Sequence, residues 1–186
     1  GEWDVVMYAH CGGRYADIEV AHDGRFERSV EVHSSWGTFE WLLEDAFRLG
    51  YRAGVVANSD GHKGRPGASY PGAGKFGAIG GLTCFSMESL TRENLLDAMR
   101  KRRHYGTTGG PNGRMIINLA AEFESEATVY SDDPNLFPDA SGEPAKHAQM
   151  GDIVHVPSGS VTLSGNVETT SPIERVEIFN GTKLIH

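Results

Sequence analysis

The sequence predicts an α/β region over residues 1–109 followed by an all-β region over residues 110–186. Short apolar runs alternate with helical patterns in the first region, which is typical of a buried parallel sheet with helical crossovers. From Met115 onward apolar residues recur at every second position, as in half-buried antiparallel strands. The change of period near residue 110 is the reason for dividing the chain there.

Three apolar runs in the first region predict parallel strands, at residues 5–9, 30–33 and 53–57. A helix is expected between the second and third runs, because Phe39 begins an apolar stripe at helical spacing. Thr38 is the predicted N-cap of this helix, and Gly50 is the predicted left-handed residue at its end. The stripe consists of Phe39, Leu42, Leu43, Ala46 and Phe47.

A second helix is predicted to follow Thr91 as its N-cap, with Leu90 and Leu95 forming a hydrophobic staple. In the all-β region, strands are expected at residues 115–123, 153–156, 161–163 and 176–179. Asn180-Gly181 is the strongest hairpin signal. Residues 132–146 are rich in Pro, Asp, Ser and Gly and are expected to form an exposed loop.

Composition excludes two classes of partner. The chain has 17 Lys+Arg against 25 Asp+Glu, a net charge of −8, and 39% hydrophobic residues. The acidic balance argues against a nucleic-acid partner, since phosphate contacts need clustered cations. No apolar stretch approaches the roughly 20 residues of a membrane span. We therefore expect a soluble globular protein with neither a nucleic-acid nor a membrane partner.

Polar residues follow the predicted parallel strands, and the C-terminal strand ends of such sheets hold ligands. His10 follows the first run, His33 ends the second, and Asp60 and His62 follow the third. On extended backbone Asp60 and His62 would leave on the same side. A carboxylate and imidazoles that converge there suit a divalent metal such as Zn, Mn or Fe, or a role in proton transfer. The alternative is a helix-capping Asp60 with a solvated His62.

Two neighbouring features extend this candidate site. Glu31 lies between valines and must be buried, so it needs a partner; together with His33 it is predicted as a metal ligand or as an outer residue that orients a ligand. Residues 61–81 are rich in glycine and form a candidate substrate flap, in which Lys63 and Arg65 would bind an anionic group. The alternative is a solvated loop kept soluble by these charges.

The cysteines and the remaining histidines are weaker candidates for the site. Cys11 and His10 are adjacent on a strand and so point to opposite faces, which makes them a poor nucleophile–base pair. Cys84 is expected in the core. Four histidines without convergent partners are expected on the surface: His22, His147, His155 and His186.

The ordered motifs resemble the PHP (polymerase and histidinol phosphatase) superfamily, and within it the CehA/McbA-like metallohydrolase branch. His10 stands in Tyr-Ala-His-Cys-Gly-Gly-Arg, and Glu31 and His33 stand in Val-Glu-Val-His-Ser-Ser-Trp-Gly-Thr-Phe-Glu. Asp60 and His62 stand in Asn-Ser-Asp-Gly-His-Lys-Gly-Arg-Pro-Gly. Further similar segments are residues 80–83, 91–93, 103–109 and 150–153.

The resemblance implies the C-terminal part of a distorted (β/α)7 PHP-type barrel, a TIM-like barrel, over residues 1–109, followed by a partial β-sandwich. It implies two or three divalent metals (Zn, Mn or Fe) in the complete protein, with His10, Asp60 and His62 among the ligands. The implied reaction is hydrolysis of a small-molecule phosphate, carboxylic or carbamate ester by a metal-activated hydroxide. This is the chemistry of a phosphoesterase-like hydrolase.

One departure from the superfamily pattern qualifies the expectation. The superfamily opens with a His-x-His motif, and this sequence has none. We therefore expect an incomplete barrel and a truncated β-sandwich, completed by the N-terminal half or by a homo-oligomer. The alternative function is a non-catalytic binding module whose β-sandwich engages carbohydrate or protein. A cysteine-dependent hydrolase is a third reading, in which Cys11 alkylation would abolish activity and metal chelation would not.

Overall fold

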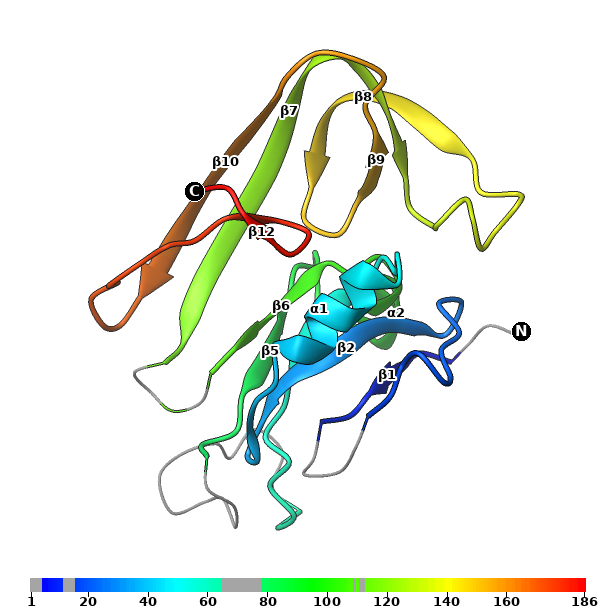
Figure 1. Cartoon of the computed structure of the whole chain (residues 1–186). Helices are drawn as coiled ribbons and strands as arrows, with labels where there is room; N and C mark the ends of the chain where they lie inside the picture. The colour runs from blue at the N-terminus through cyan, green and yellow to red at the C-terminus, as the bar shows by residue number, and fades with distance from the viewer. Residues whose placement is uncertain (1–4, 12–15, 65–77, 109, 111–112) are drawn as a thin grey trace.

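The fold is mainly β rather than a barrel of alternating strands and helices. The computed structural model describes residues 5–11, 16–64, 78–108, 110 and 113–186 (Figure 1). Of these, 40% lie in strands and 10% in two helices, and they form no closed barrel. The predicted part of a (β/α)7 barrel is therefore wrong for the described residues.

Three strands form the parallel sheet that the short apolar runs predict. β2 (Glu27–Ser34) lies at its centre, with β1 (Met7–Ala9) on one side and β4 (Gly54–Ala57) on the other, both parallel to it. A two-residue strand, β3 (Gly37–Thr38), turns back antiparallel against the end of β2. All three parallel strands thus bring their C-terminal ends to one edge.

The next strand pair explains why no barrel forms. β5 (Leu82–Phe85) and β6 (His104–Thr107) pair antiparallel with each other, whereas a βα barrel needs every strand parallel to its neighbours. They lie beside β4 without extending its ladder: the Thr83 hydroxyl donates to the Ala57 carbonyl over 2.8 Å. Apolar runs show that strands exist, but they do not encode the direction of pairing between distant strands.

The helix α1 (Trp41–Arg48) covers one face of β2. Its buried Leu42 and Ala46 pack with Val30 and Cys11 in the main apolar cluster. Burial of a side chain such as Leu42, which is fully inaccessible, contributes about 2 kcal/mol. The predicted N-cap is wrong, because Thr38 belongs to β3 and the N-cap residue is Glu40, whose side chain makes no cap bond. Gly50 is left-handed as predicted, with φ +77°.

The helix α2 (Arg92–Arg100) begins where the sequence predicts. The Thr91 hydroxyl accepts a hydrogen bond from the Asn94 amide over 3.2 Å, which satisfies one free donor of the first turn. The predicted hydrophobic staple is wrong, because Leu90 is 85% exposed. No helix in the described parts of the chain is long and apolar enough to cross a membrane.

The C-terminal region is antiparallel, as the two-residue period predicts. The long strand β7 (Met115–Tyr130) pairs with β10 (Val161–Thr169) along its first half and with β8 (Gly142–Gln149) and β9 (Ile153–His155) towards its end. β8 begins inside the stretch 132–146 that was predicted as a loop. These four strands form one hydrogen-bonded sheet.

A small hairpin ends the described chain. β11 (Phe179–Asn180) pairs with β12 (Lys183–Leu184), so the Asn180-Gly181 signal identifies the hairpin correctly. The two residues between the strands are Gly181 and Thr182, and Gly181 has the positive φ, +59°, that such turns require.

Candidate functional site

The predicted site residues meet at the C-terminal edge of the parallel sheet. His10 directly follows β1, and Asp60 lies three residues beyond β4. Their side chains approach across this edge: His10 Nε2 lies 3.9 Å from Asp60 Oδ2. His62 joins them through Asp60, with its Nδ1 3.2 Å from Asp60 Oδ1. The three predicted ligands therefore lie together, as two pairs that share one carboxylate.

The backbone brings Asp60 and His62 together in a different way from that predicted. Neither residue is extended, since both have left-handed φ values of 45° and 47°. His62 Nδ1 also lies 2.7 Å from the Asp60 carbonyl oxygen, which closes a tight loop around Gly61. Non-glycine residues in this conformation are uncommon and cluster at functional sites. The predicted proximity holds, but a loop produces it rather than strand alternation.

Glu31 orients His10 from the centre of the sheet. The Glu31 side chain is 2% exposed, and its Oε2 contacts His10 Nδ1 and accepts from the Cys11 amide over 2.9 Å. Its Oε1 accepts from Asn58 Nδ2 over 2.7 Å. Both carboxylate oxygens therefore have protein partners. A carboxylate on one ring nitrogen of a histidine leaves the other ring nitrogen to face a metal, which is how outer residues orient metal-binding histidines.

Asp60 carries the feature that most resembles an incomplete coordination sphere. Its side chain is 11% exposed, and its buried Oδ2 atom has no hydrogen-bond partner. Two donors of one zinc ion each lie about 2.1 Å from it, so they are at most about 4.2 Å apart. The 3.9 Å between His10 Nε2 and Asp60 Oδ2 satisfies this limit. Yet in the described residues no three acidic, His or Cys side chains surround a common point.

His33 is placed differently from the other predicted residues. It is buried, with Nδ1 2.8 Å from the Thr38 hydroxyl and Nε2 2.8 Å from the Ile79 carbonyl oxygen. Because both ring nitrogens have protein partners, His33 holds residues 78–81 against the sheet and we leave it out of the ligand set. Gly80 allows this segment to approach the backbone of Ser59 closely, since a Cβ at residue 80 would lie 2.3 Å from the Ser59 carbonyl oxygen.

The structure describes only one of the two predicted substrate-binding residues. Lys63 follows His62 directly and is exposed at the rim of the site. Arg65 lies outside the described residues, as does most of the proposed flap. Only Lys63 therefore has a defined place relative to Asp60.

Sequence reasoning missed the residues that support Glu31 and Asp60. Asn58 bonds Glu31 and also donates to the Tyr8 hydroxyl over 3.3 Å, while the Ser35 hydroxyl donates to the Asp60 carbonyl over 3.1 Å. Asn58 was detectable, because it directly follows a predicted strand, as His10 does. Ser35 carries no such signal, since its contact depends on a turn after β2.

Cys11 is unsuited to act as a nucleophile. It is 2% exposed, and burial together with the nearby Glu31 charge raises the pKa of its thiol to about 11. The thiolate is the reactive form, so almost none is present near neutral pH. The same two causes raise the pKa of Tyr8. Cys84 lies half-buried in β5.

No protein-family model, curated protein or solved structure matches this chain.

Proposed function

We propose that the chain is a metal-dependent hydrolase of phosphate, carboxylic or carbamate esters, with His10, Asp60 and His62 as ligands of a divalent cation. The observation that carries the proposal is the buried Asp60 Oδ2, which lacks a hydrogen-bond partner and lies 3.9 Å from His10 Nε2. A buried carboxylate oxygen without a donor is costly unless a cation compensates it.

The donor set supports the same class of metal. Two imidazoles and one carboxylate suit Zn or Fe, and the carboxylate also suits Mn. Bound here, such a cation would lower the pKa of water towards neutrality and stabilise negative charge on an ester.

The chain's own residues would position that chemistry. Glu31 fixes the ring of His10, and Asn58 in turn fixes Glu31 through its 2.7 Å hydrogen bond. Exposed Lys63 at the rim offers a positive charge to an anionic substrate. Left-handed Asp60 and His62 hold their side chains at the sheet edge without a strand to support them.

The test is metal binding, read without reference to activity. We would strip the protein with chelator, reload it with Zn, and measure stoichiometry by plasma mass spectrometry and affinity by calorimetry. Asp60→Asn and His62→Asn are the informative variants, because Asn tolerates left-handed φ and the two changes remove the carboxylate charge and one imidazole ligand, respectively. His147→Ala is the matched control, since its side chain is 73% exposed in the C-terminal sheet.

We expect stoichiometric Zn in the wild type and in His147→Ala, and sub-stoichiometric Zn in both Asn variants. Glu31→Gln should weaken affinity about 10–100-fold, as for other outer residues that orient a ligand. A screen of p-nitrophenyl phosphate and p-nitrophenyl acetate then tests hydrolysis. A wild type that stays empty after reloading contradicts the proposal.

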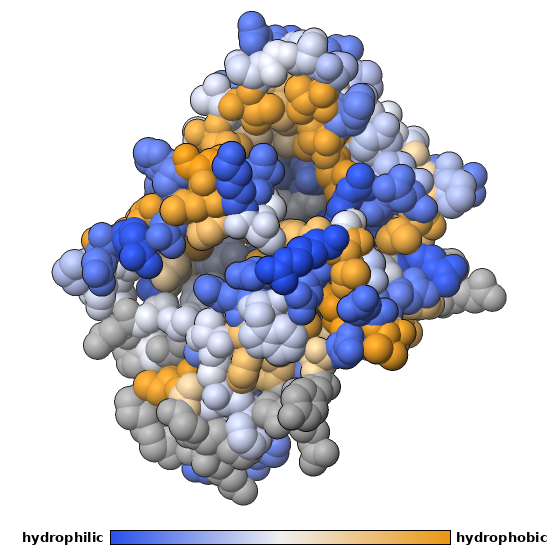
Figure 2. Space-filling view, in the orientation of Figure 1, coloured by the Kyte–Doolittle hydropathy of each residue, from blue (hydrophilic) through white to orange (hydrophobic). Residues whose placement is uncertain are grey.

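In that event the non-catalytic binding module becomes the leading function. A specific feature favours it: an apolar trough of about 370 Å³ on the C-terminal sheet, lined by residues that include Phe123, Val154 and Leu163. Figure 2 shows hydrophobic residues gathered over this part of the molecule.

A further inference from the structure

A second site is suggested by a hollow at the opposite end of the parallel sheet. It has a volume of about 520 Å³ and lies where β2 and β4 begin, against the turn that follows β7. Its walls include four arginines: Arg25, Arg28, Arg52 and Arg102. Small-molecule sites of about 300–1,000 Å³ often occur at such junctions between regions.

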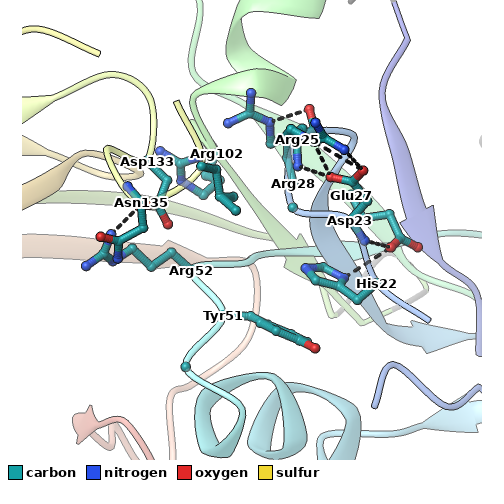
Figure 3. Close-up of a pocket in the computed structure, with 13 residues that line it drawn as sticks. His22, Asp23, Arg25, Glu27, Arg28, Tyr51, Arg52, Arg102, Asp133 and Asn135 are labelled. Carbon is teal, nitrogen blue, oxygen red and sulfur yellow. Dashed lines mark hydrogen bonds and ion pairs between the residues drawn. The ribbon is translucent and has the colours of Figure 1, made fainter. Parts of the chain in front are cut away.

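Figure 3 shows the labelled side chains in two groups that face one another across this hollow. One group comes from residues 22–28, before and within β2. The other combines Arg52 and Arg102 with Asp133 and Asn135 of the C-terminal region. Tyr51 lies below both groups, and His22 stacks on its ring with a centroid distance of 4.0 Å.

The lining of the hollow combines the four arginines with three carboxylates, those of Asp23, Glu27 and Asp133. Arg25 pairs with Asp23, and Arg52 pairs with Asp133. Arg102 donates to carbonyl oxygens, including those of Gly151 over 3.1 Å and Ser131 over 3.3 Å.

Arg28 lies 3.2 Å from Asp132, a carboxylate that is 47% exposed. Burial and the positive charge of Arg28 lower the pKa of Arg102 to about 10. The two guanidinium groups therefore repel each other, and the carboxylates of Asp132, Asp133 and Asp152 offset part of this repulsion. An anion in the hollow would offset more of it.

Two buried nitrogens in the walls lack hydrogen-bond partners. Among the buried polar side-chain atoms that the structure describes, His22 Nδ1 and Arg28 Nη1 have no hydrogen-bond partner. Both side chains are only 6% exposed, and the 3.1 Å approach of His22 Nδ1 to Glu27 Oε2 lacks hydrogen-bond geometry. A guanidinium nitrogen can only donate, so what these walls need is an acceptor.

We propose that this hollow binds the phosphoryl group of a small phosphomonoester, with Arg28, Arg52 and His22 as its donors. A dianion with oxygens directed to several sides can accept from donors on both walls, and arginine recognises phosphate through paired N–H groups. Tyr51 and Leu136 supply apolar surface for the organic part of the ligand. This site is separate from the candidate metal centre and does not rest on the proposed hydrolase function.

The experiment is a titration of the chelator-treated protein with inorganic phosphate, at constant ionic strength and pH 7.5, followed by NMR of the His22 ring. Acetate is titrated in parallel as a carboxylate probe. We expect saturable phosphate binding with a Kd of about 1 mM or tighter, and weaker acetate binding. Equal affinity for acetate would overturn the phosphoryl assignment.

Two variants each remove one of the proposed donors. Arg52→Gln changes a side chain that is 43% exposed, and His22→Phe preserves the stacking on Tyr51 while removing both ring nitrogens. Each should weaken phosphate affinity about tenfold, as expected for loss of a charged or buried donor. Calorimetry serves for His22→Phe, which lacks the NMR reporter.

Arg48→Gln is the matched control, because Arg48 lies on α1 with a side chain 64% exposed and does not line the hollow. Its affinity should equal that of the wild type. The proposal is overturned if phosphate does not saturate, or if Arg52→Gln, His22→Phe and Arg48→Gln bind it equally well.

Discussion

The two ends of the parallel sheet differ sharply, although the same strands build both. At the C-terminal ends, His10, Asp60 and His62 gather around a carboxylate oxygen that lacks a donor. At the N-terminal ends, Arg28 Nη1 is a buried donor without an acceptor, and the buried His22 Nδ1 has no hydrogen-bond partner. One end is therefore suited to a cation and the other to an anion. Charge at each end, rather than the sheet itself, determines which ligand fits.

The two ends of the sheet also differ in the contacts that position their side chains. The C-terminal end is organised within the N-terminal region, through Glu31 and Asn58. The N-terminal end is organised by contacts to the C-terminal region: Arg28 pairs with Asp132 and Arg52 with Asp133. A substitution in the C-terminal sheet should therefore disturb the arginine-lined hollow more than it disturbs the candidate metal centre.

The largest expected effect comes from removing the acceptor beneath the candidate metal centre. Glu31→Ala leaves the Cys11 amide and Asn58 Nδ2 without their acceptor and should lower the free energy of unfolding by about 3 kcal/mol. Urea denaturation measures this. Glu44→Ala is the control, because its side chain is 52% exposed, and it should change stability by less than about 0.5 kcal/mol. A similar loss in both variants would show that Glu31 is not central to this end.

A smaller loss is expected at the arginine-lined end. Arg102→Met keeps most of the side-chain volume but leaves the Gly151 and Ser131 carbonyls without their donor, and should cost about 2 kcal/mol. The same urea titration applies, with exposed Arg48→Met as control. If Arg102→Met is as stable as the wild type, the link between the two regions lies elsewhere.

The smallest expected effect is a dependence of the free energy of unfolding on pH. His104 is 4% exposed and bonds Ser29 and the Val55 carbonyl, and burial is the main cause that lowers its pKa. The unfolded chain therefore binds more protons at this residue than the folded chain does. Its contribution to stability is present above the unfolded pKa of about 6.5 and is lost as the pH falls towards the lower, folded pKa.

Unfolding in urea at pH 8, 7, 6 and 5 checks this prediction. The free energy of unfolding should fall over the acid part of this range, and His104→Gln should flatten the fall. An unchanged slope in His104→Gln would assign the pH dependence to other groups.

Local sequence patterns predicted the elements well where adjacent residues determine them. The parallel strands, the Thr91 cap of α2 and the antiparallel pairing of β7 follow from apolar period and capping chemistry. The barrel was wrong because pairing direction is a long-range property: β5 and β6 pair with each other in antiparallel fashion. The resemblance to a hydrolase superfamily and the function it implies stay predictions.

Two further errors have the same long-range origin. His22 was expected on the surface, but its side chain is buried against Tyr51, nearly thirty residues away in the chain. Thr38 was expected to cap α1, but its hydroxyl bonds His33 across the turn between β2 and β3. The expectation of surface positions does hold for His147, His155 and His186.

By itself, the sequence determined that His10, Asp60 and His62 follow strands, and parallel strands bring residues that follow them to one edge. Only the tertiary structure decided how Asp60 and His62 meet, because their left-handed backbone depends on contacts with residues such as Ser35. Only the tertiary structure assembled the arginine-lined hollow. Its residues come from segments around positions 22–28, 50–52, 102 and 133–136, and no local period relates segments that meet only when the chain folds.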